Sequence, residues 1–99
     1  MQLSYPRSFP SDSAGISFPL LECWNAMTKV ATVAADVDKK RVLCRVSLEV
    51  LIEKYDASED APMQTISRQR HEIQAAARRL IEHGVFEEDG SILIRACDL

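Results

Sequence analysis

The sequence has few of the residues on which several common kinds of functional site depend. It contains three glycines and no glycine-rich phosphate loop, dinucleotide fingerprint or hydrolase serine turn. Its three cysteines, Cys23, Cys44 and Cys97, form no Cys-x-x-Cys pair, and its two histidines, His71 and His83, are not spaced to share a metal ion. We therefore expect no disulfide framework, no zinc site and no cofactor.

Long hydrophobic runs and an excess of basic residues are also absent. The longest stretch without a charged residue, residues 13–21, is far shorter than the roughly 20 apolar residues of a membrane span. The first residues lack the apolar segment of a secretory signal, so we expect a cytoplasmic protein with reduced, mostly buried thiols and no membrane partner. The net charge of −3 and the aromatic content of 6% argue against a protein that coats nucleic acid.

The composition that is present is typical of one globular domain. Hydrophobic residues make up 46% of the 99 residues and charged residues 27%. Residues 1–15 are rich in serine and proline and offer few apolar side chains, which predicts a loose N-terminal extension. We expect residues 16–99 to form a single domain.

Three segments in the first half of that domain indicate strands or turns. Residues 16–18 alternate apolar and polar before a proline, which favours a short edge strand. Residues 20–27 fit a loop or a short helix, with Trp24 as a core or covering residue. Two runs with a period of two, residues 31–37 and 42–46, flank a polar cluster at 38–41. They predict an antiparallel hairpin whose register stays open.

Helices are expected in the second half of the domain. Ser47 is a suitable N-cap for a helix that runs to about Tyr55. After an acidic loop at residues 56–62, Pro62 is suited to a helix entry, and residues 63–83 form the longest regular element. Gly84 then serves as a left-handed C-cap.

The residues after that cap predict a second hairpin. Residues 85–95 contain Asp89-Gly90, a pair that suits a type I′ turn. The predicted fold class is therefore α+β. A small antiparallel sheet, made of the N-terminal strand and two hairpins, packs against two helices, the longer at about residues 63–83.

The order of several short motifs resembles a known family. These motifs are Ile16-Ser17-Phe18-Pro19, Trp24-Asn25, Cys44-Arg45-Val46-Ser47, the helix positions Arg70, Ile73, Ala77, Ile81 and Gly84, and the pairs Asp89-Gly90 and Asp98-Leu99. Over residues 16–99 they resemble the small bacterial family known as domain of unknown function 1488. Val33 stands where that family has an aromatic residue, and residues 38–41 replace a glycine-containing turn. The resemblance implies a similar fold. It points to no particular activity, because the function of that family is unassigned.

Arg70 is the charged residue whose position is hardest to explain. On a helical wheel that starts at Ile66, Ile73 falls at about 340°, Ala77 at about 20° and Arg70 at about 40°, within the apolar stripe. A guanidinium there must pair, extend to the edge of the stripe, or belong to a site. Three interpretations stay open. They are a partner among Glu53, Asp56 and Asp98, an anchor for a ligand carboxylate or phosphate, and an interface contact.

The other candidate binding residues are basic and fall into two groups. Lys39, Lys40, Arg41 and Arg45 lie in the first predicted hairpin, and Arg78 and Arg79 lie on the outer face of the long helix near Arg68. One interpretation is a soluble turn that discourages edge pairing and a helix face whose charges pair with Glu72 and Glu82. The alternative is a split patch that binds nucleic acid.

No residue combination in the sequence points to catalysis. Cys44 shares the parity of Val42 and Val46 in a predicted strand, so we expect it to be buried and inert. Residues 87–89 are clustered carboxylates, but they lie at a predicted hairpin tip in water. We expect a small cytoplasmic accessory or interaction domain that is not an enzyme and that binds a protein partner or itself through a sheet edge or face.

Two alternatives belong to other classes. A nucleic-acid-binding regulator would show a continuous basic face from the first hairpin to the long helix. A small-ligand binder anchored by Arg70 would have a pocket beneath that residue.

Overall fold

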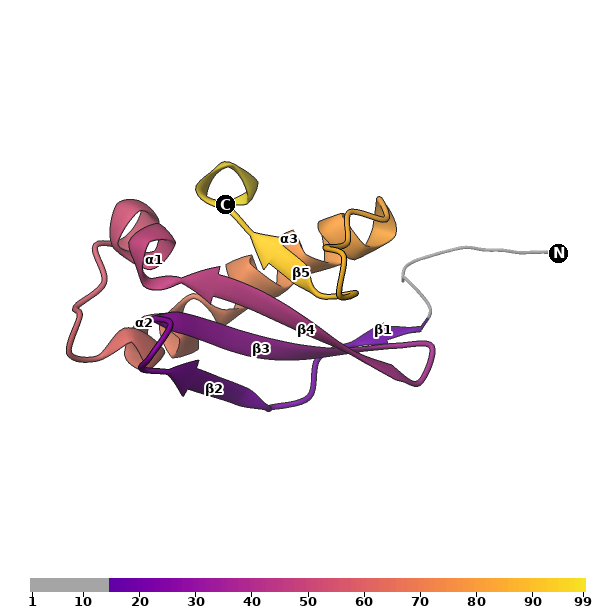
Figure 1. Cartoon of the computed structure of the whole chain (residues 1–99), viewed down its shortest axis with the longest axis horizontal. Coiled ribbons are helices and arrows are strands. Elements are labelled where there is room, and N and C mark those ends of the chain that lie inside the picture. Colours follow the sequence, from indigo (N-terminus) through magenta and orange to yellow (C-terminus); the bar gives the residue numbers. More distant parts are fainter. Residues whose placement is uncertain (1–14) are drawn as a thin grey trace, which may run out of the picture.

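The computed structural model describes residues 15–99, which form an α+β arrangement of five strands, three α-helices and a short 3-10 helix (Figure 1). The predicted class is confirmed. The expected loose extension lies outside the described residues, apart from Gly15. In chain order the elements are β1 (Ile16–Ser17), β2 (Glu22–Asn25), β3 (Val30–Val37), β4 (Lys40–Ser47), α1 (Leu48–Tyr55), α2 (Pro62–Arg68), α3 (Arg70–Glu82), β5 (Ile92–Ile94) and the 3-10 helix η3 (Ala96–Asp98).

The centre of the sheet is the predicted hairpin of β3 and β4. The two strands pair antiparallel over their whole length, from Val30 opposite Ser47 to Val37 opposite Lys40. Asp38 and Lys39 form the turn with φ values of 50° and 72°, the left-handed backbone that a two-residue type I′ turn requires. Lys40 therefore belongs to the strand and not to the turn, and the register that the sequence left open is fixed.

The outer edge of β3 carries two short strands. β1 pairs with the end of β3, as Ile16 opposite Val37, which confirms the expected edge strand. The expectation of a loop or short helix at residues 20–27 is wrong, because β2 pairs with the start of β3, with Cys23 opposite Thr32. The Asn25 side chain accepts hydrogen bonds from the backbone N–H groups of residues 27 and 28, at 2.9 and 3.2 Å, and so stabilises the turn that makes a hairpin of β2 and β3.

The helical half of the chain agrees with the sequence except at one point. Ser47 caps α1 by accepting a hydrogen bond from the N–H of Val50 at 3.3 Å. The single helix expected at residues 63–83 is two helices, because the backbone of Gln69 (φ −104°, ψ 21°) departs from helical geometry. The bend leaves Ile66 of α2 and Ile73 of α3 both fully buried.

The predicted C-terminal hairpin is wrong. β5 pairs with β4 in parallel, with Cys44 opposite Ile92, because the chain crosses over through the three helices and returns in the same direction. The sheet is therefore mixed, and three helices pack with it. Of the Asp89-Gly90 pair only the glycine has a positive φ, of 86°, whereas a type I′ turn needs two. The Asp89 carboxylate instead accepts hydrogen bonds from the N–H and hydroxyl of Ser91, at 2.9 and 2.6 Å, within a loop.

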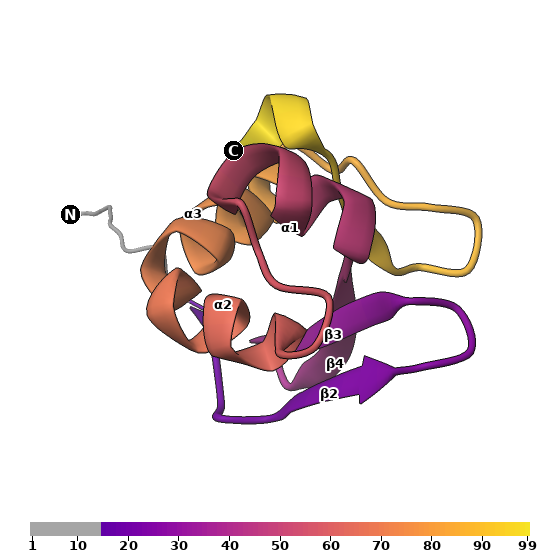
Figure 2. The same ribbon diagram turned by 90° about the vertical axis from the view of Figure 1, so that its left-hand side faces the viewer.

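The helices gather on one side of the sheet and leave the other side open (Figure 2). The core lies between the two layers. Its fully buried members include Ala31, Val33, Ala35, Cys44, Val46, Leu51, Ile66, Ile73, Ala76, Ala77, Ile92 and Ile94. Trp24 packs against this core, as expected. Strand residues of the opposite parity, together with Leu21 just before β2, form what we call the open face. It includes Leu21, Cys23, Thr32, Ala34, Asp36, Arg41, Leu43, Arg45 and Leu93.

The three cysteines differ in their surroundings. Cys44 is fully buried, as expected, and burial raises the pKa of its thiol to about 11. The expectation of mostly buried thiols is wrong for the other two. Cys23 is exposed on the open face and Cys97 in η3.

We predict that thiol reagents distinguish these cysteines in the folded protein. At about pH 8, Cys23 and Cys97 should be labelled quickly, and Cys44 only after denaturant is added, because the thiolate is the reactive form. Mass spectrometry of the labelled protein counts the modified thiols. Labelling of Cys44 at the same rate as the other two would contradict its buried position in β4.

Candidate functional site

Arg70 is paired inside the molecule. Its Nε and Nη2 groups donate to the two carboxylate oxygens of Glu22, at 2.6 and 3.0 Å, and this bidentate pair joins the first turn of α3 to β2. None of the three partners considered from the sequence is the observed one. Glu22 lies 48 residues away in the chain, on a strand that the sequence did not reveal.

This pair corresponds to the first of the three interpretations of Arg70, a charged partner within the chain. An open hollow of about 320 Å³ adjoins the residue, lined by residues 67–72 where α2 meets α3. The guanidinium edge that would grip an anion is already occupied by Glu22. The geometry therefore favours a structural role for Arg70 over a ligand anchor.

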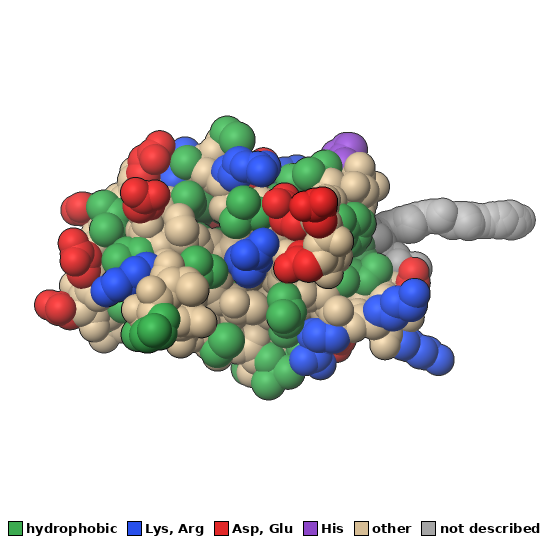
Figure 3. All heavy atoms as spheres, viewed as in Figure 1, with side chains coloured by type: hydrophobic (Ala, Val, Ile, Leu, Met, Phe, Trp, Pro, Cys, Tyr) green, Lys and Arg blue, Asp and Glu red, His purple; other side chains and the backbone are tan. Residues whose placement is uncertain are grey.

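The basic residues of the hairpin lie at one end of the molecule. Lys39 and Lys40 are exposed at the tip, and Arg41 forms a cross-strand ion pair with Asp36 at 2.6 Å. Figure 3 shows this group of basic side chains at the hairpin end of the open face. A local basic cluster is present here, and one of its charges is partly neutralised.

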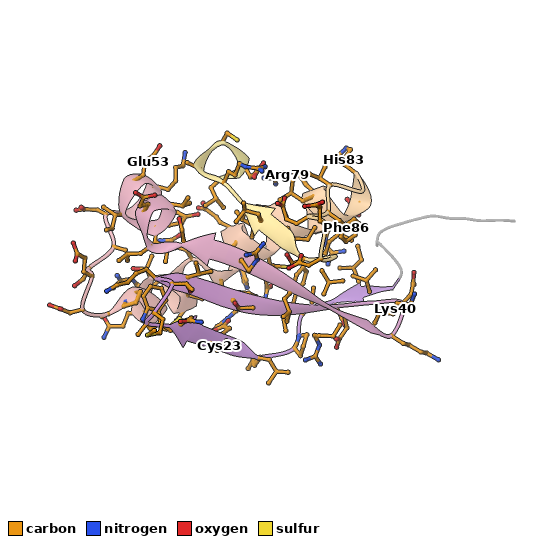
Figure 4. All side chains as sticks on the ribbon, in the orientation of Figure 1. Cys23, Lys40, Glu53, Arg79, His83 and Phe86 are labelled. Carbon is orange, nitrogen blue, oxygen red and sulfur yellow. The ribbon has the colours of Figure 1, made fainter. Side chains whose placement is uncertain are left out.

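The arginines of α3 point toward other neighbours. Arg78 lies over the ring of Phe18, with its guanidinium carbon 5.6 Å from the ring centre, a cation–π arrangement. Arg79 donates to the backbone carbonyl of Asp98 at 2.6 Å. Figure 4 shows Lys40 and Arg79 on separate parts of the surface. The structure thus does not bring the two predicted basic groups together in one face.

Arg45 lies on the open face of β4, between Thr32 of β3 and Leu93 of β5. Its Nε is buried and has no hydrogen-bond partner among the described residues. Asp89 of the neighbouring loop has a lowered pKa, chiefly because Ser91 donates two hydrogen bonds to it and secondarily because of the positive charge of Arg45. Arg45 thus shares the open face with Arg41 and lies close enough to Asp89 to lower the pKa of its carboxyl.

The open face carries the apolar surface that the sequence did not reveal. Leu21 and Leu43 are 50% and 48% exposed and flank Ala34, whose side chain lies beneath them. With Cys23, Thr32 and neighbouring residues they line a shallow hollow of about 200 Å³. Figure 3 shows hydrophobic side chains along this part of the molecule. Once β2 is a strand, the alternation of Leu21 and Cys23 against Glu22 and Trp24 places the first pair on this face.

Exposed apolar side chains also flank β2 in the chain. Leu20, two residues before the strand, is 77% exposed, and Met27, two residues after it, is 92% exposed. These are the most exposed large hydrophobic residues among residues 15–99. β2 is an edge strand, since it pairs with β3 on one side, and Figure 1 shows it at the rim of the sheet. We call the outer rim of β2 with Leu20 and Met27 the β2 edge.

These features define a small α+β domain with a mixed sheet, helices on one side of it, an open face on the other, and an apolar edge strand, β2. The chain belongs to the family described as a protein of unknown function, DUF1488, whose model matches residues 16–94. This confirms the resemblance noted from the sequence motifs.

A solved structure has the same fold. It is a protein of unknown function from the DUF1488 family of Shewanella loihica PV-4, with a TM-score of 0.78 and 18% sequence identity. The match covers 86% of this chain and 97% of that one. No curated protein matches the chain.

Two further observations concern the described part of the chain. Residues 15–99 hold no group of three or more histidine, cysteine, aspartate or glutamate side chains arranged to bind a metal ion. None of the helices in these residues is long and apolar enough to cross a membrane.

We predict that the Arg70–Glu22 pair stabilises the fold. Arg70→Leu leaves the mostly buried carboxylate of Glu22 without its partner and should lower Tm by several degrees. The double variant Glu22→Leu with Arg70→Leu should recover part of this loss, because no unpaired charge remains. Thermal unfolding followed by circular dichroism measures both, with Arg68→Leu as an exposed control. Equal shifts for Arg70→Leu and Arg68→Leu would show that the pair contributes nothing.

We also predict a loss of stability at high pH from Tyr55. Its hydroxyl on α1 donates to Glu72 of α3 at 3.0 Å. Burial, and then this hydrogen bond and the charge of Glu72, raise its pKa to about 12. Between about pH 10 and about pH 12 the unfolded chain releases the phenolic proton while the folded protein keeps it, so the free energy of unfolding falls as pH rises.

Denaturant unfolding at several pH values across that range measures this effect. The slope of stability against pH should be shallower in Tyr55→Phe than in the wild type, because other groups that titrate there are common to both. Parallel curves for the two proteins would contradict the raised pKa of Tyr55.

Proposed function

We propose that this protein is a small cytoplasmic interaction domain without catalytic activity, and that it binds a protein segment through the β2 edge and the adjoining open face. The observation that carries this proposal is the concentration of exposed apolar side chains there. Leu20, Leu21, Met27 and Leu43 are each about half exposed or more, and all lie on or beside β2 or on the open face. Soluble proteins rarely keep such groups together unless the surface is used for contact.

The backbone of β2 supports the same proposal. An edge strand presents unpaired N–H and C=O groups to which an extended segment can add as a further strand. β2 contains no proline or lysine, which are common protections against such pairing. The single charged residue of β2, Glu22, forms an ion pair with Arg70. The hollow between Leu21 and Leu43 offers a seat for an apolar side chain of the bound segment.

The chemistry of the other candidate residues supports a role in binding more than in catalysis. The buried thiol of Cys44 has a raised pKa, which disfavours the nucleophilic thiolate. The charged groups of Arg70, Arg41 and Arg79 are each engaged by a neighbour in the chain. These three arginines thus have partners within the chain, whereas the apolar residues beside β2 are open to contact.

Selection from a displayed library of linear peptides tests the proposal. The wild-type domain is the bait. The double variant Leu21→Lys with Leu43→Lys is used for counter-selection, which removes peptides that bind to other parts of the domain. Phe86→Lys, which replaces a residue 44% exposed on the α3–β5 loop, is the matched control. We expect enriched peptides that bind the wild type and Phe86→Lys equally and the double variant at least about tenfold more weakly, a loss of about 1.4 kcal/mol. Failure to enrich peptides with this preference would overturn the proposal.

A separate NMR experiment tests the nucleic-acid alternative. Amide NMR spectra of the labelled domain are recorded with mixed short DNA and RNA, first at low and then at moderate salt. We expect no salt-sensitive shifts at residues 39–45 or 68–79. Shifts confined to those residues that vanish as salt rises would replace the proposed function with nucleic-acid binding.

A further inference from the structure

We propose that the segment that binds the β2 edge is β2 of a second copy of this chain, paired antiparallel about a two-fold axis that passes beside Cys23. This inference rests on the proposed function and names its partner. Each half of such an interface is the same surface, so the β2 edge must be complementary to itself. The backbone register and the flanking side chains both meet this condition.

The backbone groups available for pairing follow from the β2–β3 register. In an antiparallel ladder every second residue bonds to its partner strand, and the residues between direct their N–H and C=O groups to the other side. The N–H of Ala34 donates to the carbonyl of Leu21 at 3.0 Å, so Leu21 and then Cys23 face β3. Glu22 and Trp24 face outward. In residues 15–99 no backbone hydrogen bond outside the strand ladders involves either of them.

The same two residues determine the register between the copies. A register centred on Cys23 places Glu22 opposite Trp24 of the second copy, and Trp24 opposite Glu22 of that copy. Both outward residues of each strand then form hydrogen bonds, and the pairing stays within β2. A centre on Glu22 would require Leu20 to join the ladder and would bring two Glu22 side chains together. A centre on Trp24 would require Ala26, which lies in the β2–β3 turn. The register centred on Cys23 therefore makes the most hydrogen bonds with the strand as it stands.

The side chains at the two ends of β2 complement one another in this arrangement. Antiparallel pairing places the start of each strand, with Leu20 and Leu21, beside the end of the other, where Met27 lies. These three are the most exposed large hydrophobic residues in the described part of the chain. Pairing thus covers apolar surface at both ends at once, and burial of such surface is the main favourable term in association. Glu22 is already neutralised by Arg70, so the centre brings no unpaired charges together.

The proposed register makes Cys23 a specific reporter. On the two-fold axis it lies opposite Cys23 of the second copy, in a pair that is not hydrogen-bonded. The Cα atoms of such pairs are about 4.5 Å apart, within the range that a disulfide spans. Both thiols are exposed and lie on the same side of the joined sheet. Figure 4 shows Cys23 on β2, away from Phe86.

Mild oxidation with copper phenanthroline and oxygen tests this register. The reagent removes two electrons and two protons from a pair of thiols, and joins only thiols that meet. We expect the Cys97→Ser variant, which keeps Cys23, to form a disulfide-linked dimer at least about tenfold faster than Cys23→Ser, which keeps the exposed Cys97. Peptide mapping should find the Cys23–Cys23 bond. Equal rates for the two variants would overturn the proposed register.

The mass in solution, measured under reducing conditions by light scattering at low and high protein concentration, tests the pairing without the reporter. The wild type and Phe86→Lys should approach the dimer mass as concentration rises. The double variant Leu20→Lys with Met27→Lys should stay monomeric. At each end of the interface a lysine of one copy would lie beside a lysine of the other, and the two charges would repel and lose water on pairing. Both substituted residues are highly exposed, so the fold should be unaffected, as circular dichroism can verify.

The outcomes separate this inference from the proposed function. A wild type that stays monomeric at every concentration would overturn the second copy as partner. The proposed function would still stand if selected peptides bind the β2 edge. A dimer that the Leu20→Lys and Met27→Lys changes leave intact would also overturn the inference, since the copies would then meet elsewhere.

Discussion

The pairing of β3 with β4 is the interaction on which the rest of this structure depends. β3 pairs with β4 along one edge and with both β1 and β2 along the other. Among the described strands it therefore joins all those of the N-terminal half of the chain. Its core-facing residues, Ala31, Val33 and Ala35, are small and fully or almost fully buried, so the helices can pack close to the sheet. The same register places Ala34 and Leu43 side by side on the open face. One hairpin thus sets both the core and the candidate interaction surface.

The features that could be predicted from the sequence are those fixed by neighbours in the chain. Three examples depend only on residues within one turn or one strand. They are the period of two in β3 and β4, the N-cap Ser47 and the left-handed Gly84 at the end of α3. The order of such local features was also enough to reveal the family. They established the α+β class, the buried Cys44 and the edge strand at Ile16.

The features that could not be predicted depend on contacts across the chain. Asp89-Gly90 has the composition of a hairpin turn, but its Asp89 side chain bonds to Ser91 within a loop. The strand that follows pairs with β4 in parallel, because the chain crosses over through the three helices before it reaches β5. β2 has only four residues, too few for a periodic pattern, and its strand form depends on β3. The apolar edge was invisible for the same reason, because Leu20, Leu21 and Met27 form one surface only when β2 is a strand.

The parallel position of β5 has a consequence for how the protein folds. The β3–β4 hairpin closes over a two-residue turn, whereas β5 reaches β4 only after all three helices have been placed, at a much higher cost in loop-closure entropy. We therefore expect an intermediate in which the hairpin is formed and the β4 rim is still bare. In that species Cys44 and Val46 have lost the neighbours that cover them in the native state. Aggregation during refolding should begin at the unpaired edge of β4, which is the edge of the sheet opposite to β2.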